Sequence, residues 1–131
     1  MRTLDLDLRP ERFAVIRLAQ DAEIPWWVES SAFFSVTRTD SDVSIVCDET
    51  AVPHADESRG GLRCLAVRGP LGFSEVGVLS SLARPLAEAE ISIFTISSFA
   101  TDYVFVSDDV VEKAVAALEA AGHVIKRGKA P

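Results

Sequence analysis

The chain has 131 residues, of which 48% are hydrophobic and 25% are charged. This composition is typical of a soluble globular protein with a core of its own. Thirteen Lys and Arg against 20 Asp and Glu give a net charge of −7, which argues against nucleic acid as the main partner. No signal peptide is recognisable, and no apolar run approaches the roughly 20 residues of a membrane span. A cytoplasmic protein without a membrane partner is expected.

The first half of the chain is typical of β structure. Alternating or continuous apolar residues predict strands at residues 3–8, 12–19, 32–38 and 43–48. Residues 39–42 (TDSD) have turn composition, so the last two strands are expected to form a hairpin. Residues 24–30 predict a short helix with Pro25 in its first turn.

A polar segment with loop composition, residues 50–61, follows these strands. Because Gly, Pro, Ser and Asp gather there, it is the expected boundary between two halves of the chain. The predicted domains are therefore residues 1–61 and residues 62–131.

The second half alternates strands and helices. Strands are predicted at residues 62–68, 91–97, 103–107 and 123–127. The first helix is expected over residues 74–86, with Ser74 as its N-cap and a kink or an early end at Pro85. Its apolar face is expected to contain Val76, Leu79, Leu82, Ala83, Leu86 and Ala87.

A second helix is expected after the third of these strands, capped by Asp108 or Asp109. Its apolar face would contain Val111, Ala114, Val115 and Leu118. Gly122 would end the helix.

The order of elements in residues 62–127 is thus β-α-β-β-α-β, the ferredoxin-like arrangement of an α+β fold. Two helices are expected on one face of a four-stranded antiparallel sheet. The other face or the sheet edges need a cover, for which the N-terminal strands and a second copy of the chain are the candidates.

The strings GPLGFSEVGVLSSLARPLAEAEISIFTISSF and DYVFV within residues 62–127 resemble the ACT domain, a regulatory module that binds amino acids. FFSVTRTDSDVSIVCDE, residues 33–49, resembles a degenerate, mostly β first ACT unit. Together, the two strings resemble those of a branch of small bacterial tandem-ACT proteins. The branch is related to the regulatory domains of aspartate kinases and to the cytosolic arginine sensors of animals.

The resemblance implies a ligand site between two ACT units. One side would consist of Gly72, Glu75, Ser98, Phe99 and Asp102. The other side would come from Ser92 and Ile93 of an opposing unit. Since this chain contains one well-formed unit, the opposing unit would belong to the second subunit of a homodimer.

The chemistry of these residues is compatible with that role. Gly72 allows a close approach of the backbone, and the N–H groups at a helix start favour a carboxylate, although Ser74 would compete for them. Glu75 and Asp102 offer two anions to a cationic or zwitterionic ligand. The alternatives are a packed turn, solvated charges and a Phe99 side chain that belongs to the core.

Other candidates are weaker. Cys47 and Cys64 lie in apolar runs and are expected to be buried thiols, with a disulfide, a metal pair or a nucleophilic Cys47 as alternatives. His54, Asp56 and Glu57 share a polar loop, which is a weak metal signal. No metal and no other cofactor is expected.

Trp26 and Trp27 are expected to cover one end of the core or to anchor a subunit contact. The sequence therefore predicts a non-catalytic ACT-domain protein that binds an amino acid. The alternatives are a protein-interaction subunit without a ligand and a detached regulatory part of an aspartate kinase-like enzyme.

Overall fold

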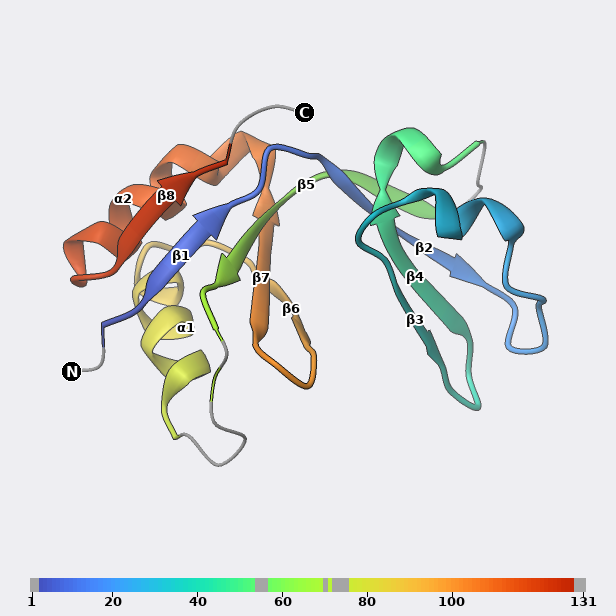
Figure 1. Ribbon diagram of the computed structural model, residues 1–131, viewed down its shortest axis with the longest axis horizontal. Helices are drawn as coiled ribbons and strands as arrows, with labels where there is room; N and C mark the ends of the chain where they lie inside the picture. The colour runs from blue at the N-terminus through green and yellow to red at the C-terminus, as the bar shows by residue number, and fades with distance from the viewer. Residues whose placement is uncertain (1–2, 54–56, 70, 72–75, 129–131) are drawn as a thin grey trace. The chain divides into compact units, whose positions relative to one another are not determined.

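The computed structural model describes residues 3–53, 57–69, 71 and 76–128. The chain forms two compact units (Figure 1). Glu11–Leu62 forms the unit called here the β unit, and Met1–Pro10 together with Arg63–Pro131 forms the α+β unit. The division differs from the expected linear one because the first ten residues belong with the C-terminal part of the chain.

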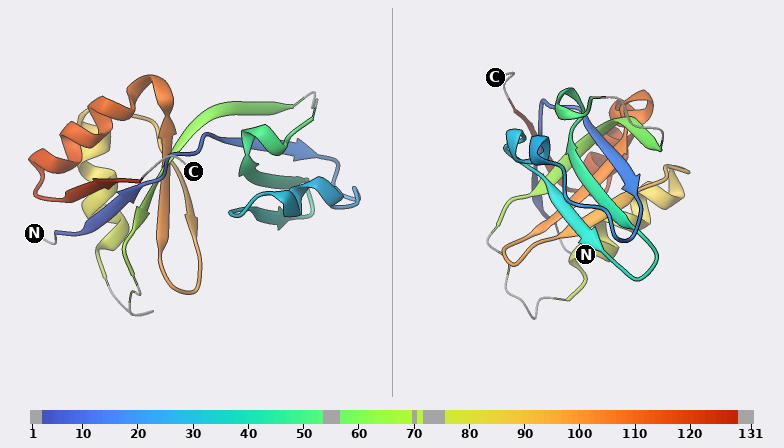
Figure 2. Two further views of the ribbon diagram at one scale, coloured as in Figure 1. Left: turned by 45° about the horizontal axis from the view of Figure 1, so that its top comes forward. Right: turned by 90° about the vertical axis from the view of Figure 1, so that its right-hand side faces the viewer.

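The α+β unit has the predicted β-α-β-β-α-β order (Figures 1 and 2). Its elements after residue 62 are the second part of β5 (Ser58–Val67), α1 (Val78–Glu88), β6 (Phe94–Ser97), β7 (Asp102–Ser107), α2 (Val111–Ala120) and β8 (Val124–Arg127). The α+β, ferredoxin-like fold class is confirmed.

The prediction of a four-stranded antiparallel sheet is wrong, because strand β1 (Asp5–Leu8) enters the sheet of this unit. The strand order is β6-β7-β5-β1-β8. β1 runs antiparallel to β5, with Leu6 opposite Val67, and parallel to β8, with Leu6 opposite Ile125. The alternation of Asp and Leu in β1 buries one face of the strand and leaves the other polar, which suits a sheet with helices on one side.

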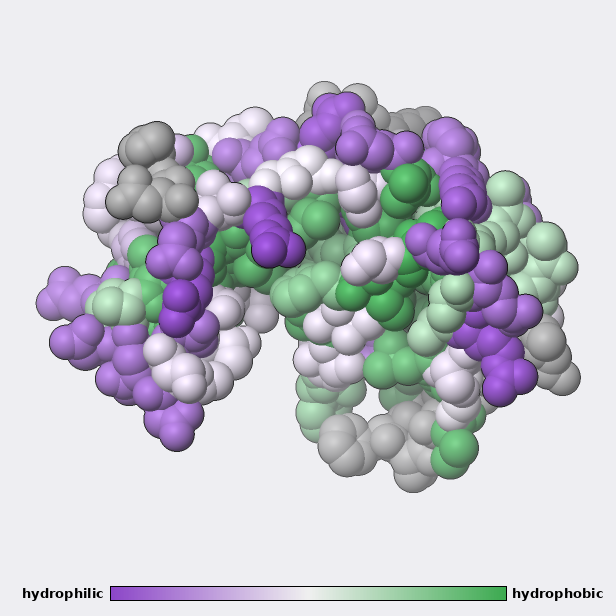
Figure 3. All heavy atoms as spheres, turned by 180° about the vertical axis from the view of Figure 1, so that it is seen from behind, coloured by the Kyte–Doolittle hydropathy of each residue, from purple (hydrophilic) through white to green (hydrophobic). Residues whose placement is uncertain are grey.

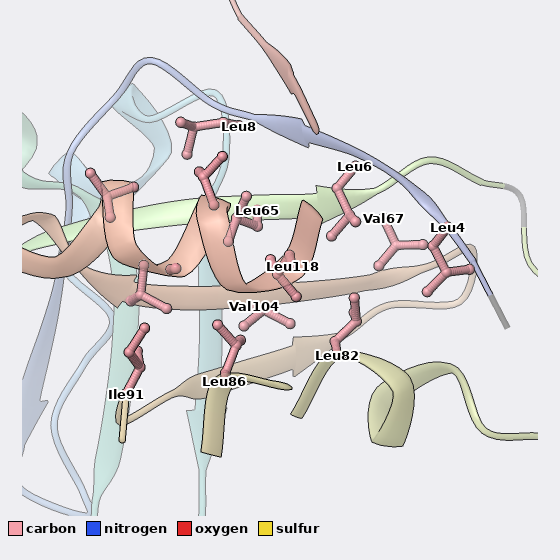
Figure 4. Packing of buried hydrophobic residues seen from close by; sticks show 14 of the residues in the cluster. Leu4, Leu6, Leu8, Leu65, Val67, Leu82, Leu86, Ile91, Val104 and Leu118 are labelled. Carbon is pink, nitrogen blue, oxygen red and sulfur yellow. The ribbon is translucent and has the colours of Figure 1, made fainter. Parts of the chain in front are cut away.

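The core of the α+β unit lies between its helices and its sheet. Figure 4 shows leucines of α1 and α2 pointing toward the apolar side chains of the strands. The largest fully buried side chains of this core include Leu6, Leu8, Leu65, Leu82, Leu86 and Leu118. Leu6 and Leu86 are completely buried, so β1 contributes to this core as fully as the first helix does.

Helix α1 begins four residues later than predicted. Gly77 occupies its N-cap position with φ of +85°, a left-handed conformation that other residues adopt only at a cost. The predicted N-cap, Ser74, lies outside the described residues. The buried face also differs: Val78, Leu82 and Leu86 are buried, whereas Val76 is 86% exposed and Leu79 37% exposed.

Pro85 does not end α1, which continues to Glu88. A proline has no N–H to donate to the carbonyl four residues earlier, and that carbonyl belongs to Ser81. The buried ring of His123 replaces the missing donor, with Nε2 2.9 Å from the Ser81 oxygen. Its Nδ1 accepts the Leu4 N–H at 3.1 Å, so the neutral ring with the proton on Nε2 satisfies both groups.

Helix α2 is close to its prediction. The expected residues Val111, Ala114, Val115 and Leu118 are all buried, and the chain turns at Gly122, whose φ is +99°. The prediction of an aspartate cap is wrong. Asp108 and Asp109 lie in a 3-10 turn, Asp108–Val110, and the Ser107 hydroxyl accepts the Asp109 N–H at 3.3 Å.

The β unit contains β2 (Phe13–Leu18), β3 (Ser35–Arg38), β4 (Val43–Asp48) and the first part of β5, in the order β3-β4-β2-β5. The predicted hairpin is confirmed: Arg38 lies opposite Val43, and the Thr39 N–H donates to the Asp42 oxygen at 2.9 Å. The loop predicted over residues 50–61 is shorter than expected, because β5 begins at Ser58. β5 pairs with β2, and the pairing register shifts between Phe13 and Val15.

Two 3-10 turns, Trp26–Ser30 and Glu49–Ala51, complete the β unit. The first confirms the predicted short helical segment, with Pro25 at its N-cap. The buried core consists of Ile16, Val28, Val43, Ile45 and Cys47, with Trp27 packed against it. Trp26, by contrast, is 85% exposed, so only one of the two tryptophans covers the core.

Candidate ligand-binding site

The turn between β6 and β7 contains the predicted site residues Ser98 and Phe99, and a third, Asp102, follows it as the first residue of β7. It is closed by the Ser98 N–H, which donates to the Thr101 oxygen at 2.9 Å, and by the Thr101 N–H, which is 3.3 Å from the Ser98 hydroxyl. Because the Ser98 hydroxyl stabilises the turn, its first role is structural.

The segment that follows β5 lies against this turn. The Leu71 N–H donates to the Ala100 oxygen at 2.8 Å, and the Thr101 hydroxyl donates to the Val67 oxygen at 2.7 Å. Gly69 permits the approach, because a Cβ there would stand 3.2 Å from the Ala100 oxygen. The strand-to-helix connection and the β6–β7 turn therefore meet at one end of the sheet, as the resemblance implied.

Asp102 and Phe99 present different chemistry at this end. Asp102, the first residue of β7, accepts the Ser97 hydroxyl proton on Oδ1 at 2.5 Å. Its Oδ2 has no hydrogen bond within the described part of the chain. Phe99 is 91% exposed, so the interpretation of Phe99 as a core residue is wrong. An anion and an aromatic ring are thus available to a ligand or a partner on one connection.

Ser92 and Ile93 lie at the opposite end of β6. Ser92 is exposed, and Ile93 packs partly against the core. Five residues of nearly extended chain separate Ile93 from Ser98, about 16 Å at 3.3 Å per residue. Within one chain the structure does not bring these two residues together with the turn.

Gly72 and Glu75 lie outside the described residues, so their predicted roles stay predictions. The helix start expected beside them is four residues further along the chain, at Val78. The Gly77 carbonyl accepts the Ser81 N–H at 3.0 Å, which is the first backbone bond of the helix, and the Ser80 hydroxyl at 3.1 Å. The N–H groups that precede Ser81 have no carbonyl partner inside the helix.

The other candidates from the sequence are two cysteines and a polar loop. Cys47 and Cys64 are buried and form no disulfide, and burial raises the pKa of the Cys47 thiol, which opposes a nucleophilic role. His54 and Asp56 lie outside the described residues, and Glu57 pairs with Arg17 at 3.3 Å. Among the described residues, no three His, Cys, Asp or Glu side chains form a group that could hold a metal.

Two contacts of the α+β unit were not predicted from the sequence. His123 bridges Leu4 and Ser81 as described above, and the mostly buried Arg63 side chain contacts Asp108 at 3.2 Å and the Arg9 oxygen at 3.1 Å. Pro85 inside α1 indicated that the Ser81 carbonyl needed a donor from outside the helix. Which residue supplies that donor depends on the tertiary fold. No described helix is long and apolar enough to cross a membrane.

Comparisons with known proteins identify the family and agree with the fold. A family model for the ACT domain matches residues 57–120, and a second model, for an N-terminal domain, matches residues 11–55. The crystal structure of a protein from Agobacterium tumefaciens has 31% identity and a TM-score of 0.93, and the match covers 99% of this chain and 97% of that one. The chain therefore belongs to the ACT domain proteins.

Its sequence is similar to the animal arginine sensors, and its fold is shared with regulatory domains of aspartate kinases. The bovine "cytosolic arginine sensor for mTORC1 subunit 1" is 36% identical over 98 residues, which are 69% of this chain but only 30% of the sensor. The regulatory subunit of aspartate kinase from Thermus thermophilus has the same fold, with 14% identity and a TM-score of 0.59 over 92% of this chain and 96% of that one.

Proposed function

We propose that this protein is a non-catalytic regulatory protein of the cytoplasm that binds an amino acid between the ACT units of a homodimer. The observation that carries the proposal is the hydrogen-bonded junction of Leu71 with Ala100. It joins the strand-to-helix connection to the turn that presents Phe99 and Asp102. We also propose that the β unit is a degenerate ACT unit, and we expect no cofactor, nucleic acid or membrane partner.

The homodimer follows from what one chain lacks. Ser92 and Ile93 stand about 16 Å along the chain from the turn, so a second subunit has to supply them to the same ligand. Strand β6, which follows them, pairs only with β7 among the described strands. Its open edge offers backbone donors and acceptors to a second copy.

The ligand would use complementary groups on the two sides. Asp102 would accept the ligand ammonium or guanidinium with Oδ2, while Ser97 holds its other oxygen. Phe99 would lie against an apolar or planar part of the ligand, which would explain why so large a ring is exposed. In the proposal, Gly72 and Glu75 complete this side of the site.

A thermal-shift screen of the free amino acids against the whole chain tests the proposal. A ligand at about 100 times its Kd stabilises the folded state by about 2.7 kcal/mol, which corresponds to a rise in Tm of about 10 °C for a chain of this size. The Asp102→Asn variant should lose the shift, and the exposed control Asp109→Asn should keep it. A well-folded sample that responds to no amino acid would contradict the proposal.

The oligomeric state is a separate test. Sedimentation analysis should give twice the chain mass of 14.2 kDa, with ligand strengthening the association because each site needs two subunits. A monomer that binds an amino acid would remove the shared site from the proposal and leave the binding function in place.

A second candidate is an interaction subunit without a ligand. The β unit exposes Ile24, Trp26 and Phe34, with Trp26 85% accessible, and Figure 3 shows exposed apolar surface in green beside hydrophilic surface in purple. An aspartate kinase-like catalytic subunit is one partner to test. This candidate predicts that Trp26→Ala abolishes co-purification with the partner while Asp102→Asn has no effect, which is the reverse of the ligand-binding proposal.

A further inference from the structure

The sheet of the β unit has a hollowed face opposite its core. Val15 of β2 pairs with Val46 of β4 and with Arg59 of β5, while Arg17 pairs with Ser44. Paired residues of an antiparallel ladder share a face, so these side chains lie opposite Ile16, which belongs to the core. The hollow has a volume of about 370 Å³ and is lined by residues of β2, by Ser44 and by the start of β5.

The charges in this hollow are unequally satisfied. The Arg17 guanidinium contacts Asp42 at 3.0 Å and Glu57 at 3.3 Å, and hydrogen bonds to these carboxylates raise its pKa. Its charge is therefore balanced within the unit. Arg59 makes no ion pair or hydrogen bond through its side chain among the described residues, and Glu57 uses only Oε2. Within the described part of the chain, one cation and one carboxylate oxygen of the hollow therefore have no partner.

The backbone spacing of Glu57 and Arg59 sets the scale of the ligand. Glu57 directly precedes β5 and is two residues from Arg59, and the Arg17 N–H of β2 donates to the Glu57 backbone oxygen at 3.0 Å. At about 3.3 Å per residue, their Cα atoms lie about 7 Å apart along the strand. Both side chains line the same hollow.

We propose that this hollow binds an ω-amino carboxylate, a small molecule whose carboxylate and ammonium are separated by three or four carbons. Arg59 would hold the carboxylate through paired N–H donors, and Glu57 would accept the ammonium. Val15 would underlie the methylene chain, with the Ser44 hydroxyl at its side. The site lies within the β unit and does not rest on the proposed function of the α+β unit.

The same charges exclude other small ligands. An α-amino acid whose side chain carries no cation has its two charges close together, so it would reach Arg59 and Glu57 at once less readily than an ω-amino carboxylate. A phosphate dianion would gain Arg59 but would meet the carboxylates of Glu57 and Asp42. A simple carboxylate would leave Glu57 without its partner and bind more weakly.

Titration of the ¹⁵N-labelled whole chain, followed by amide chemical shifts, tests the proposal. The probes are 4-aminobutyrate, butyrate, n-butylamine and glycine. We expect saturable shifts with 4-aminobutyrate at residues 15–17, 44 and 57–59, and affinities at least tenfold lower for the three other probes. The spectrum also reports whether each variant is folded.

Matched variants identify the groups. Arg59→Gln and Glu57→Gln should each weaken 4-aminobutyrate binding at least tenfold, and Glu29→Gln, which removes an exposed carboxylate elsewhere in the β unit, should leave it unchanged. Absence of saturable shifts at 20 mM 4-aminobutyrate would overturn the proposal. Equal affinity for butyrate or glycine, or binding that survives Arg59→Gln, would overturn it as well.

Discussion

The two units differ in how their cores are built. Fifteen described residues from three strands, two helices and the segments beside them form the main buried cluster of the α+β unit, whereas five form that of the β unit. The β unit also uses side chains that bind backbone groups, as when the Arg38 guanidinium holds the oxygens of Gln20 and Ala22. Because burial of apolar area is the main stabilising term, the α+β unit should be the more stable part.

The largest effect is expected in the core of the α+β unit. Leu82→Ala removes a side chain that is only 1% exposed and should lower the free energy of unfolding by about 3 kcal/mol. Leu79→Ala, on the same helix but 37% exposed, is the control and should cost less than about 1 kcal/mol. Equal losses in urea unfolding would contradict the buried face assigned to α1.

The bridge formed by His123 should have the next largest effect. His123→Ala leaves the Leu4 N–H and the Ser81 carbonyl buried without partners, which should cost about 2 kcal/mol. In that background Pro85→Ala restores an N–H for Ser81 and should recover part of the loss. A double-mutant cycle measures this coupling; additive losses would contradict the bridge.

A conservative change in the β unit sharpens the comparison. Ile45→Val removes one methyl group from a fully buried position and should cost about 1 kcal/mol. Native-state hydrogen exchange should then show faster exchange for the amides of the β unit and little change for β1, β8 and α2. Uniform acceleration across both units would show that they unfold as one.

The smallest effect concerns an exposed ion pair of the α+β unit. Hydrogen bonds from Arg127 lower the pKa of Glu112 from its ordinary value of 4.5. A carboxylate with a lowered folded-state pKa stabilises the protein above pH 4.5, and this contribution is lost as the pH falls through the lowered value. Urea unfolding of Glu112→Gln should therefore show a slight destabilisation at pH 7 and no effect at low pH. Equal losses at both pH values would contradict the contribution of the ion pair.

Local patterns predicted most of the fold. Helix α2 and its buried face followed from periodicity, and the hairpin followed from the TDSD turn. The start of α1 was missed because Val76 and Leu79 continue the apolar periodicity of the helix. The left-handed conformation of Gly77 at the N-cap could not be predicted, because N-cap residues usually have extended backbone. The place of β1 could not be predicted, because its alternation indicates a strand without indicating a partner about 60 residues away.

The candidate site was predictable only in part. The resemblance to the ACT domain predicted that residues 98–102 belong to the site, and in the structure this segment contacts Leu71. The exposure of Phe99 had no local signal, since an aromatic residue after a strand is equally compatible with a core. Whether Ser92 and Ile93 meet the turn depends on a second subunit, which the sequence of one chain does not specify.

The most direct test of the central claim is an amide chemical-shift titration of the whole chain with the amino acid that gives the largest thermal shift. Binding at the proposed site between two ACT units predicts saturable shifts at Leu71, at residues 98–102 and at Ser92 and Ile93. The amides of the β-unit core should not change. Saturation without shifts at residues 98–102, or shifts confined to the β unit, would contradict the account.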